Sequence, residues 1–81
     1  MTCIATFFAH IGAIRFKKYC DAHQIKARIM PVPRTLSSSC GTCVKFECET
    51  PPAFPEFPEE TESVVEVIPD GYRELYRASD S

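Results

Sequence analysis

The chain lacks an apolar run long enough to cross a bilayer. Its most apolar stretch, residues 3–14, is interrupted by His10 and Gly12 and has no basic leader before it. A transmembrane helix needs about 20 apolar residues, and a secretory signal begins with a basic segment. We therefore expect neither, and we expect a cytoplasmic protein whose cysteines stay reduced.

Patterns that bind metals, form disulfides or bind nucleic acids are also missing. Five cysteines is an odd number, which argues against a closed disulfide framework. Two histidines and a single close cysteine pair argue against a zinc finger. Arginine and aromatic residues are not interleaved as they are in proteins that bind single-stranded nucleic acid. We expect no metal, no cofactor and no nucleic-acid partner.

The composition is that of one small globular domain, residues 1–81, with 44% hydrophobic and 25% charged residues. The charge is unevenly divided. Residues 1–46 carry seven Lys or Arg against Asp21 alone, whereas residues 47–81 carry two against ten acids. Either the acidic half folds back onto the basic half or both are solvated, or the basic half is a docking face for an acidic partner or a phosphate group.

Residues 3–8 are short, apolar and β-prone, and predict a buried strand. Residues 10–24 predict an amphipathic helix, with Ile11 and Ile14 off its apolar face. That face carries Gly12, Ala13, Phe16, Tyr19, Cys20 and His23. We therefore expect the Cys20 thiol in the core.

Residues 25–32 predict a second strand, which two prolines end. Residues 42–48 alternate as a third strand, so that Val44, Phe46 and Cys48 face one way and Cys43, Lys45 and Glu47 the other. Residues 50–58 hold four prolines and predict an extended connector. Residues 72–76 predict a last strand, before a frayed tail at 78–81.

Residues 59–68 fit two structures. Pro58 followed by two glutamates is typical of a helix start, and we predict a helix here. The alternative is a hairpin, because the segment is rich in β-branched residues and precedes a Pro-Asp-Gly turn. With the helix, the order is βαββαβ, an α+β ferredoxin-like sandwich with an antiparallel sheet and two helices on one face.

Right-handed connections then make the first two strands parallel, with the third strand between them. The end of the first strand, the start of the first helix and the loop at residues 33–41 should share one edge of the sheet. We therefore expect His10, Arg34 and Cys40 to meet near a helix N-terminus. A cysteine among hydroxyls and beside Gly41 is accessible, and its thiolate can be stabilised there.

Residues 29–41 and the following Val44-Lys45-Phe46 resemble a family of small bacterial selenium/sulfur carrier-like domains. The family pattern is a strand ending in Pro-x-Pro-Arg, a Ser-Ser-Cys-Gly loop, and a strand with a basic residue before an aromatic one. The resemblance extends in pattern over residues 3–77. This chain differs in having Ala9-His10 where a Ser/Thr-type cap is usual, and Cys43 where a small apolar residue is usual.

The resemblance implies a carrier and accessory protein rather than a complete enzyme. Cys40 would accept sulfur or selenium from a donor such as a cysteine desulfurase and pass it to an acceptor enzyme. A thiol is mostly protonated at neutral pH, so loading needs groups that favour the thiolate. The candidates are the Arg34 cation and the donors Ser37, Ser38 and Ser39, beside a helix N-terminus.

Three alternatives remain open. The Cys40-x-x-Cys43 pair could form a dithiol/disulfide redox site. An extended strand would separate the two Cα atoms by about 10 Å, and a disulfide needs less than about 7 Å, so this requires a bend at Gly41. The pair with His10 could supply part of a zinc site, although no fourth ligand is apparent. The protein could also be a non-catalytic subunit that binds a larger complex through Ile11, Ile14 and its charges.

Overall fold

The computed structural model describes residues 1–36, 38–47 and 60–78. Ser37, Cys48, the expected connector at 50–58 and residues 79–81 of the expected frayed tail lie outside them. The elements follow in the order β1 (Thr2–Phe7), α1 (His10–Ala22), β2 (Ala27–Pro31), β3 (Thr42–Glu47), β4 (Thr61–Ile68) and β5 (Gly71–Arg77).

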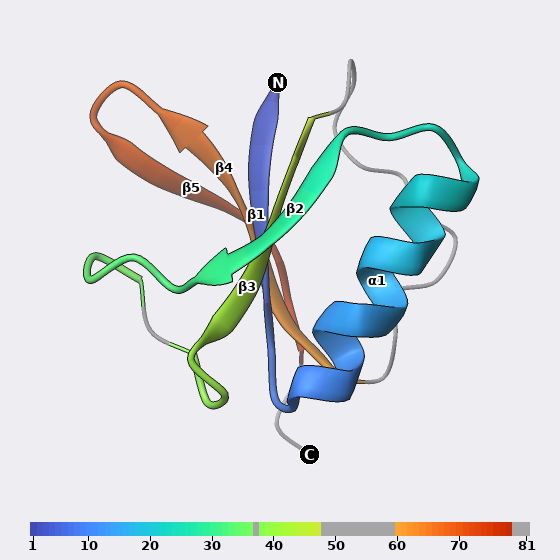
Figure 1. Cartoon of the computed structure of the whole chain (residues 1–81). Coiled ribbons are helices and arrows are strands. Elements are labelled where there is room, and N and C mark those ends of the chain that lie inside the picture. Colours follow the sequence, from blue (N-terminus) through green and yellow to red (C-terminus); the bar gives the residue numbers. More distant parts are fainter. Residues whose placement is uncertain (37, 48–59, 79–81) are drawn as a thin grey trace.

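The strands form one antiparallel sheet in the order β2-β3-β1-β4-β5. Helix α1 packs on one face of this sheet (Figure 1). Because β3 runs antiparallel to both β1 and β2, the first two strands are parallel with β3 between them, as the sequence predicts. The end of β1, the start of α1 and the start of β3 therefore lie at the same end of the sheet.

The predicted helix at 59–68 is wrong, and the hairpin alternative is what forms. Strand β4 pairs with β1 on one side and with β5 on the other, and its Val64 lies opposite Ala5. The β-branched residues of this segment suit a half-buried pleated surface, and this preference outweighs the helix-like start. The described residues thus form one helix and five strands in an α+β fold, not a ferredoxin-like sandwich with two helices.

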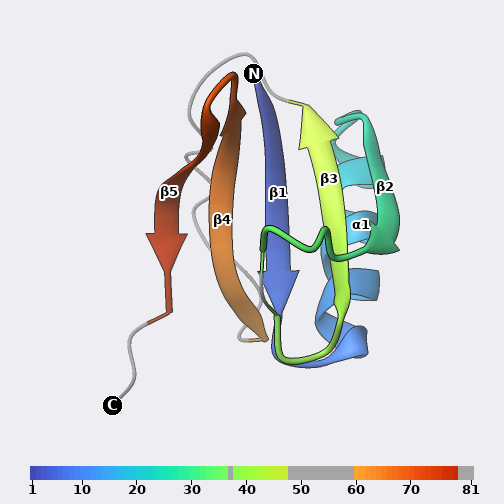
Figure 2. The same ribbon diagram turned by 90° about the vertical axis from the view of Figure 1, so that its left-hand side faces the viewer.

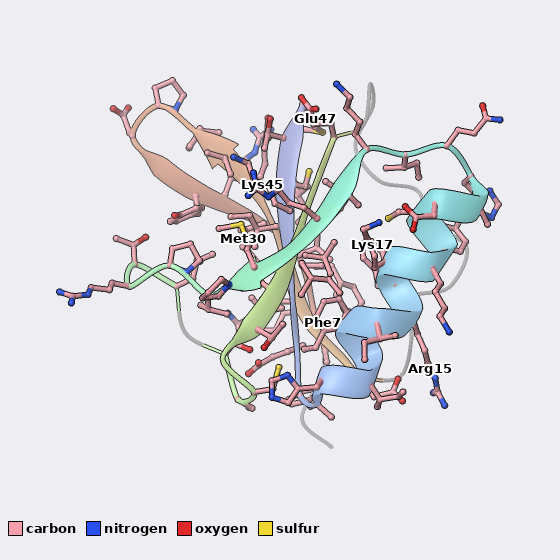
Figure 3. The ribbon with its side chains drawn as sticks, viewed as in Figure 1. Phe7, Arg15, Lys17, Met30, Lys45 and Glu47 are labelled. Atoms are coloured by element: carbon pink, nitrogen blue, oxygen red, sulfur yellow. The ribbon has the colours of Figure 1, made fainter. Side chains whose placement is uncertain are left out.

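The core between α1 and the sheet is built around three phenylalanine rings. The centroid of Phe16 lies 5.8 Å from that of Phe7 and 5.1 Å from that of Phe46. Cys20 is fully buried beside them, as its place on the helix predicts. Figure 3 shows Phe7 between the sheet and the helix. At the end of the helix, His23 is exposed.

Helix α1 sits close to the beginning of β4. A Cβ atom added at Gly12 would lie 2.5 Å from the Cβ of Glu60, so only glycine allows this approach. Arg15 reaches across from the outer side of α1, with its Nη1 2.7 Å from Oε1 of Glu60 (Figure 3). The neighbouring Ile11 and Ile14 are 47% and 43% exposed, off the buried face as expected.

The other face of the sheet is covered by a loop instead of a helix. The chain after β2 crosses in front of β3 and β1, then turns back to the end where β3 begins (Figure 2). Its Val32 and Leu36 pack on a small buried cluster formed by Ile4, Cys43 and Val65. The hydroxyl of Thr35 is 2.9 Å from that of Tyr72 on β5, which fastens the loop across the face.

Candidate functional site

Cys40 lies at the end of the sheet where α1 begins. The loop places it two residues before β3, and it packs partly buried against the helix-side core. Oγ1 of Thr42, the first residue of β3, is 2.9 Å from Nδ1 of His10, the first residue of α1. The structure thus brings His10 and the Cys40 segment to one corner of the fold.

The start of α1 has no side chain that caps it. Ala9 precedes the helix in extended conformation without a side-chain hydrogen bond, and no acid occupies the first turn. The free amides and the dipole at a helix N-terminus favour negative charge nearby. Helix α1 begins at the corner that holds Cys40, and Glu60 packs against its first turn at Gly12.

Ser38 connects the loop to β1. Its hydroxyl donates to the carbonyl oxygen of Phe7 at 3.0 Å, and its Oγ is 3.9 Å from Sγ of Cys40. Since its proton is used on Phe7, Ser38 offers an acceptor to the sulfur. The single thiol proton of Cys40 has a nearer acceptor in the carbonyl oxygen of Thr42, at 3.4 Å. The Ser38 hydroxyl and the Thr42 carbonyl thus both lie at the sulfur of Cys40.

Ser39 is held by a residue that the sequence analysis missed. Glu62 of β4 accepts the Ser39 amide at 3.1 Å on Oε1 and lies 3.4 Å from its hydroxyl through Oε2. The predicted helix at 59–68 concealed this role, because Glu62 reaches the loop only from a strand beside β1. The β-branched pattern around it was the available indication.

Arg34 does not join this corner. It is exposed and forms no hydrogen bond or ion pair with any residue of the described ranges. Its loop neighbours Val32 and Leu36 pack on the sheet face away from α1. The loop is long enough to cross that face before it returns to Cys40, which places Arg34 on the crossing part. Ser37 lies outside the described residues.

Gly41 makes the turn from the loop into β3. Its φ of +72° is a left-handed conformation that other residues adopt only with strain, and nothing lies within 4 Å of a Cβ built there. A Cβ atom at this position would therefore point into open space.

Residues 2–68 match a family model described as "Putative Se/S carrier protein-like". The chain belongs to this family. The match covers β1 to β4 and so includes the Cys40 loop and Glu62. No curated protein and no solved structure matches the chain.

In this member of the Se/S carrier-like family, Cys43 is on the opposite face of the sheet from Cys40. It is fully buried in the cluster under the loop, with its Sγ 3.8 Å from the carbonyl oxygen of Pro31. Burial, together with the charge of nearby Cys40, raises the pKa of Cys43 to about 11. Cys43 therefore stays protonated at neutral pH, and both cysteines are free thiols. A dithiol site would require Cys43 to leave its cluster.

The described residues lack the features of a metal site and of a membrane-spanning helix. Within residues 1–36, 38–47 and 60–78, no group of three or more His, Cys, Asp or Glu is placed to hold a metal ion. His10 and Cys40 belong to no such group within these ranges. In the same ranges, α1 falls short of the length and apolarity that a membrane-crossing helix requires.

Proposed function

We propose that the protein is a thiol carrier of sulfur or selenium and that Cys40 is the residue that is loaded. The main support is exposure: Cys3, Cys20 and Cys43 are buried, and Cys40 is the described cysteine that solvent reaches. The family description names a selenium or sulfur carrier. A carrier thiol must meet two proteins, a donor and an acceptor, and a partly exposed loop at a sheet end permits this.

Loading is a transfer of a sulfur atom between thiols. The Cys40 thiolate attacks the outer sulfur of a donor persulfide, forms an S–S bond to it, and the donor cysteine leaves as a thiolate. No net oxidant is needed, because the outer sulfur moves at its existing oxidation level. The partners in this proposal are a persulfide donor, such as a cysteine desulfurase, and an acceptor enzyme.

The Cys40 proton must leave before attack, since a thiolate is the nucleophile. In this proposal His10, held at the same corner by its contact with Thr42, accepts that proton as a general base. The uncapped start of α1 favours the resulting anion and the persulfide anion that follows. In this proposal Ser38 and Ser39 fix the loop, through Phe7 and Glu62, and Gly41 leaves the approach open.

The test is the intact mass of the protein after incubation with a cysteine desulfurase and cysteine. We expect a gain of one sulfur atom that a reductant removes, and its loss in Cys40→Ser. Cys43→Ala is the matched control, and it should load normally. Loading that persists in Cys40→Ser, or that peptide mapping assigns to another cysteine, would overturn the proposal.

A further inference from the structure

A hollow lies on the sheet far from Cys40. It encloses about 340 Å³ and is lined by Thr2, Lys26, Ala27, Arg28, Lys45 and Glu47. Figure 3 shows Lys45 and Glu47 at the end of the sheet where β1 begins, with Phe7 at the other end. Thr2 and Phe7 are five residues apart on β1, which corresponds to about 17 Å. The hollow is thus separate from the corner that holds Cys40.

The lining is cationic, with three basic side chains and one carboxylate. The structure describes four ion pairs, and these use the basic residues Arg15, Lys17, Arg73 and Arg77. None involves a cation of the hollow. Among the residues described, Lys26, Arg28 and Lys45 have neither an ion pair nor a side-chain hydrogen bond, and the same is true of Glu47. Within the described part of the chain, three cations and one carboxylate thus leave the lining of the hollow with a net positive charge.

Two of these cations face each other directly. Arg28 of β2 and Lys45 of β3 are register partners in neighbouring antiparallel strands. Like charges in such positions destabilise a sheet, and an anion between them would remove the repulsion. By alternation, Lys45 lies on the same face as Cys43, away from α1, and Figure 3 shows it there beside Met30.

From this arrangement we propose that the hollow binds a small phosphorylated molecule, about the size of a sugar phosphate or a nucleoside monophosphate. The guanidinium of Arg28 and the ammonium groups of Lys26 and Lys45 would hold the phosphate. The Glu47 carboxylate repels inorganic phosphate, but it accepts hydrogen bonds from the hydroxyl or amino groups of a phosphate ester. The hollow should therefore bind an ester more tightly than inorganic phosphate. The volume lies within the range of small-molecule sites.

The experiment is a titration of the ¹⁵N-labelled protein with adenosine monophosphate, and separately with inorganic phosphate, at constant ionic strength. We expect saturable amide shifts at Thr2, Ala27 and Lys45, with a Kd of about 1 mM or tighter for the ester. Arg28→Gln and Lys45→Gln should each weaken binding about threefold or more. Lys18→Gln is the matched control, because Lys18 is an exposed cation of α1 outside the hollow.

Glu47→Gln tests the selectivity. It should strengthen the binding of inorganic phosphate, because it removes the opposing charge, while the advantage of the ester shrinks. Absent or unsaturable shifts with both probes would overturn the proposal, as would an equal loss in Lys18→Gln. Shifts produced by a glutamate-rich peptide but by neither phosphate probe would also overturn it, in favour of an acidic protein partner.

Discussion

The two faces of the sheet are sealed in different ways. On one face, helix α1 presses three phenylalanine rings and Cys20 into a continuous core. On the other, a single loop crossing covers Ile4, Cys43 and Val65, and the region beyond it stays polar and hollow. Strand β3 contributes to both, with Phe46 on the helix side and Lys45 on the loop side. Most of the buried core therefore lies under the helix, and the loop side buries only a small cluster.

The largest expected effect is a difference in stability between a variant on the helix side of the sheet and a variant on the loop side. Phe16→Ala should lower the free energy of unfolding by about 3–5 kcal/mol, because it removes a buried ring and leaves a cavity. Leu36→Ala, on the loop side, should cost less than about 2 kcal/mol, because Leu36 is only partly buried. Urea unfolding of both variants checks this. Equal losses would show that the loop is as important to stability as the helix.

The second effect is a pH dependence carried by Cys43. Its pKa is about 11 in the folded chain and near 9 when it is unfolded. Between these values the unfolded state releases a proton that the folded state keeps, so stability falls as pH rises from 9 to 11. The loss from this group is at most about 2–3 kcal/mol.

Cys43→Ala should remove this contribution. The difference between the unfolding free energies of wild type and Cys43→Ala should be constant below pH 9 and should fall between pH 9 and 11. Equilibrium unfolding across that range measures it, and the subtraction removes the titration of lysines and tyrosines. A difference that does not change with pH would show that Cys43 is more solvated than its burial indicates.

A smaller effect concerns the anchor of the Cys40 loop. Glu62→Ala removes the acceptor of the Ser39 amide and should destabilise the protein by about 1 kcal/mol. The same change should raise the alkylation rate of Cys40 severalfold, since the loop loses a contact with β4. Glu74→Ala is the matched control, because it breaks only the exposed pair with Arg77. Equal alkylation rates in both variants would argue against an anchoring role.

The smallest effect is expected at the fastening of the loop crossing. Tyr72→Phe removes the hydroxyl that Thr35 contacts and keeps the ring, at a cost of about 0.5–1 kcal/mol. Local opening should then expose Cys43, so its alkylation should accelerate while that of buried Cys20 does not. If Cys20 and Cys43 react at wild-type rates, the hydrogen bond does not hold the loop.

The sequence predicted the half of the fold in which periodicity is unambiguous. The alternation of residues 42–47 was confirmed, as was the parallel placement of β1 and β2. The apolar face of α1 was confirmed as far as Cys20, whereas His23 is exposed. The helix predicted at residues 59–68 was wrong, because the residues typical of a helix start and the β-branched residues of this segment favour different structures. The segment forms a strand because it pairs with β1, and this tertiary contact cannot be read from the residues of the segment itself.

The candidate site divides in the same way. The meeting of His10 with the Cys40 segment followed from topology alone, because it depends only on which strand ends share an edge. The position of Arg34 depends on the path of the loop, which rests on contacts of Val32 and Leu36 with distant strands. Glu62 was missed because its strand was expected to be a helix. Strand order can be deduced from chain order, whereas the route of a loop across a face cannot.

The described strands form an open sheet with β2 and β5 at its edges, and both edge strands have features that disfavour pairing with other chains. At one margin, β2 presents Arg28 and ends in Pro31, which has no amide hydrogen to offer. At the other, β5 presents Arg73 and Arg77. Charge at both margins, and proline at the β2 margin, hinder the addition of strands from other copies. Aggregation through the sheet edges is therefore disfavoured, while Cys40 stays partly exposed at the end of the sheet.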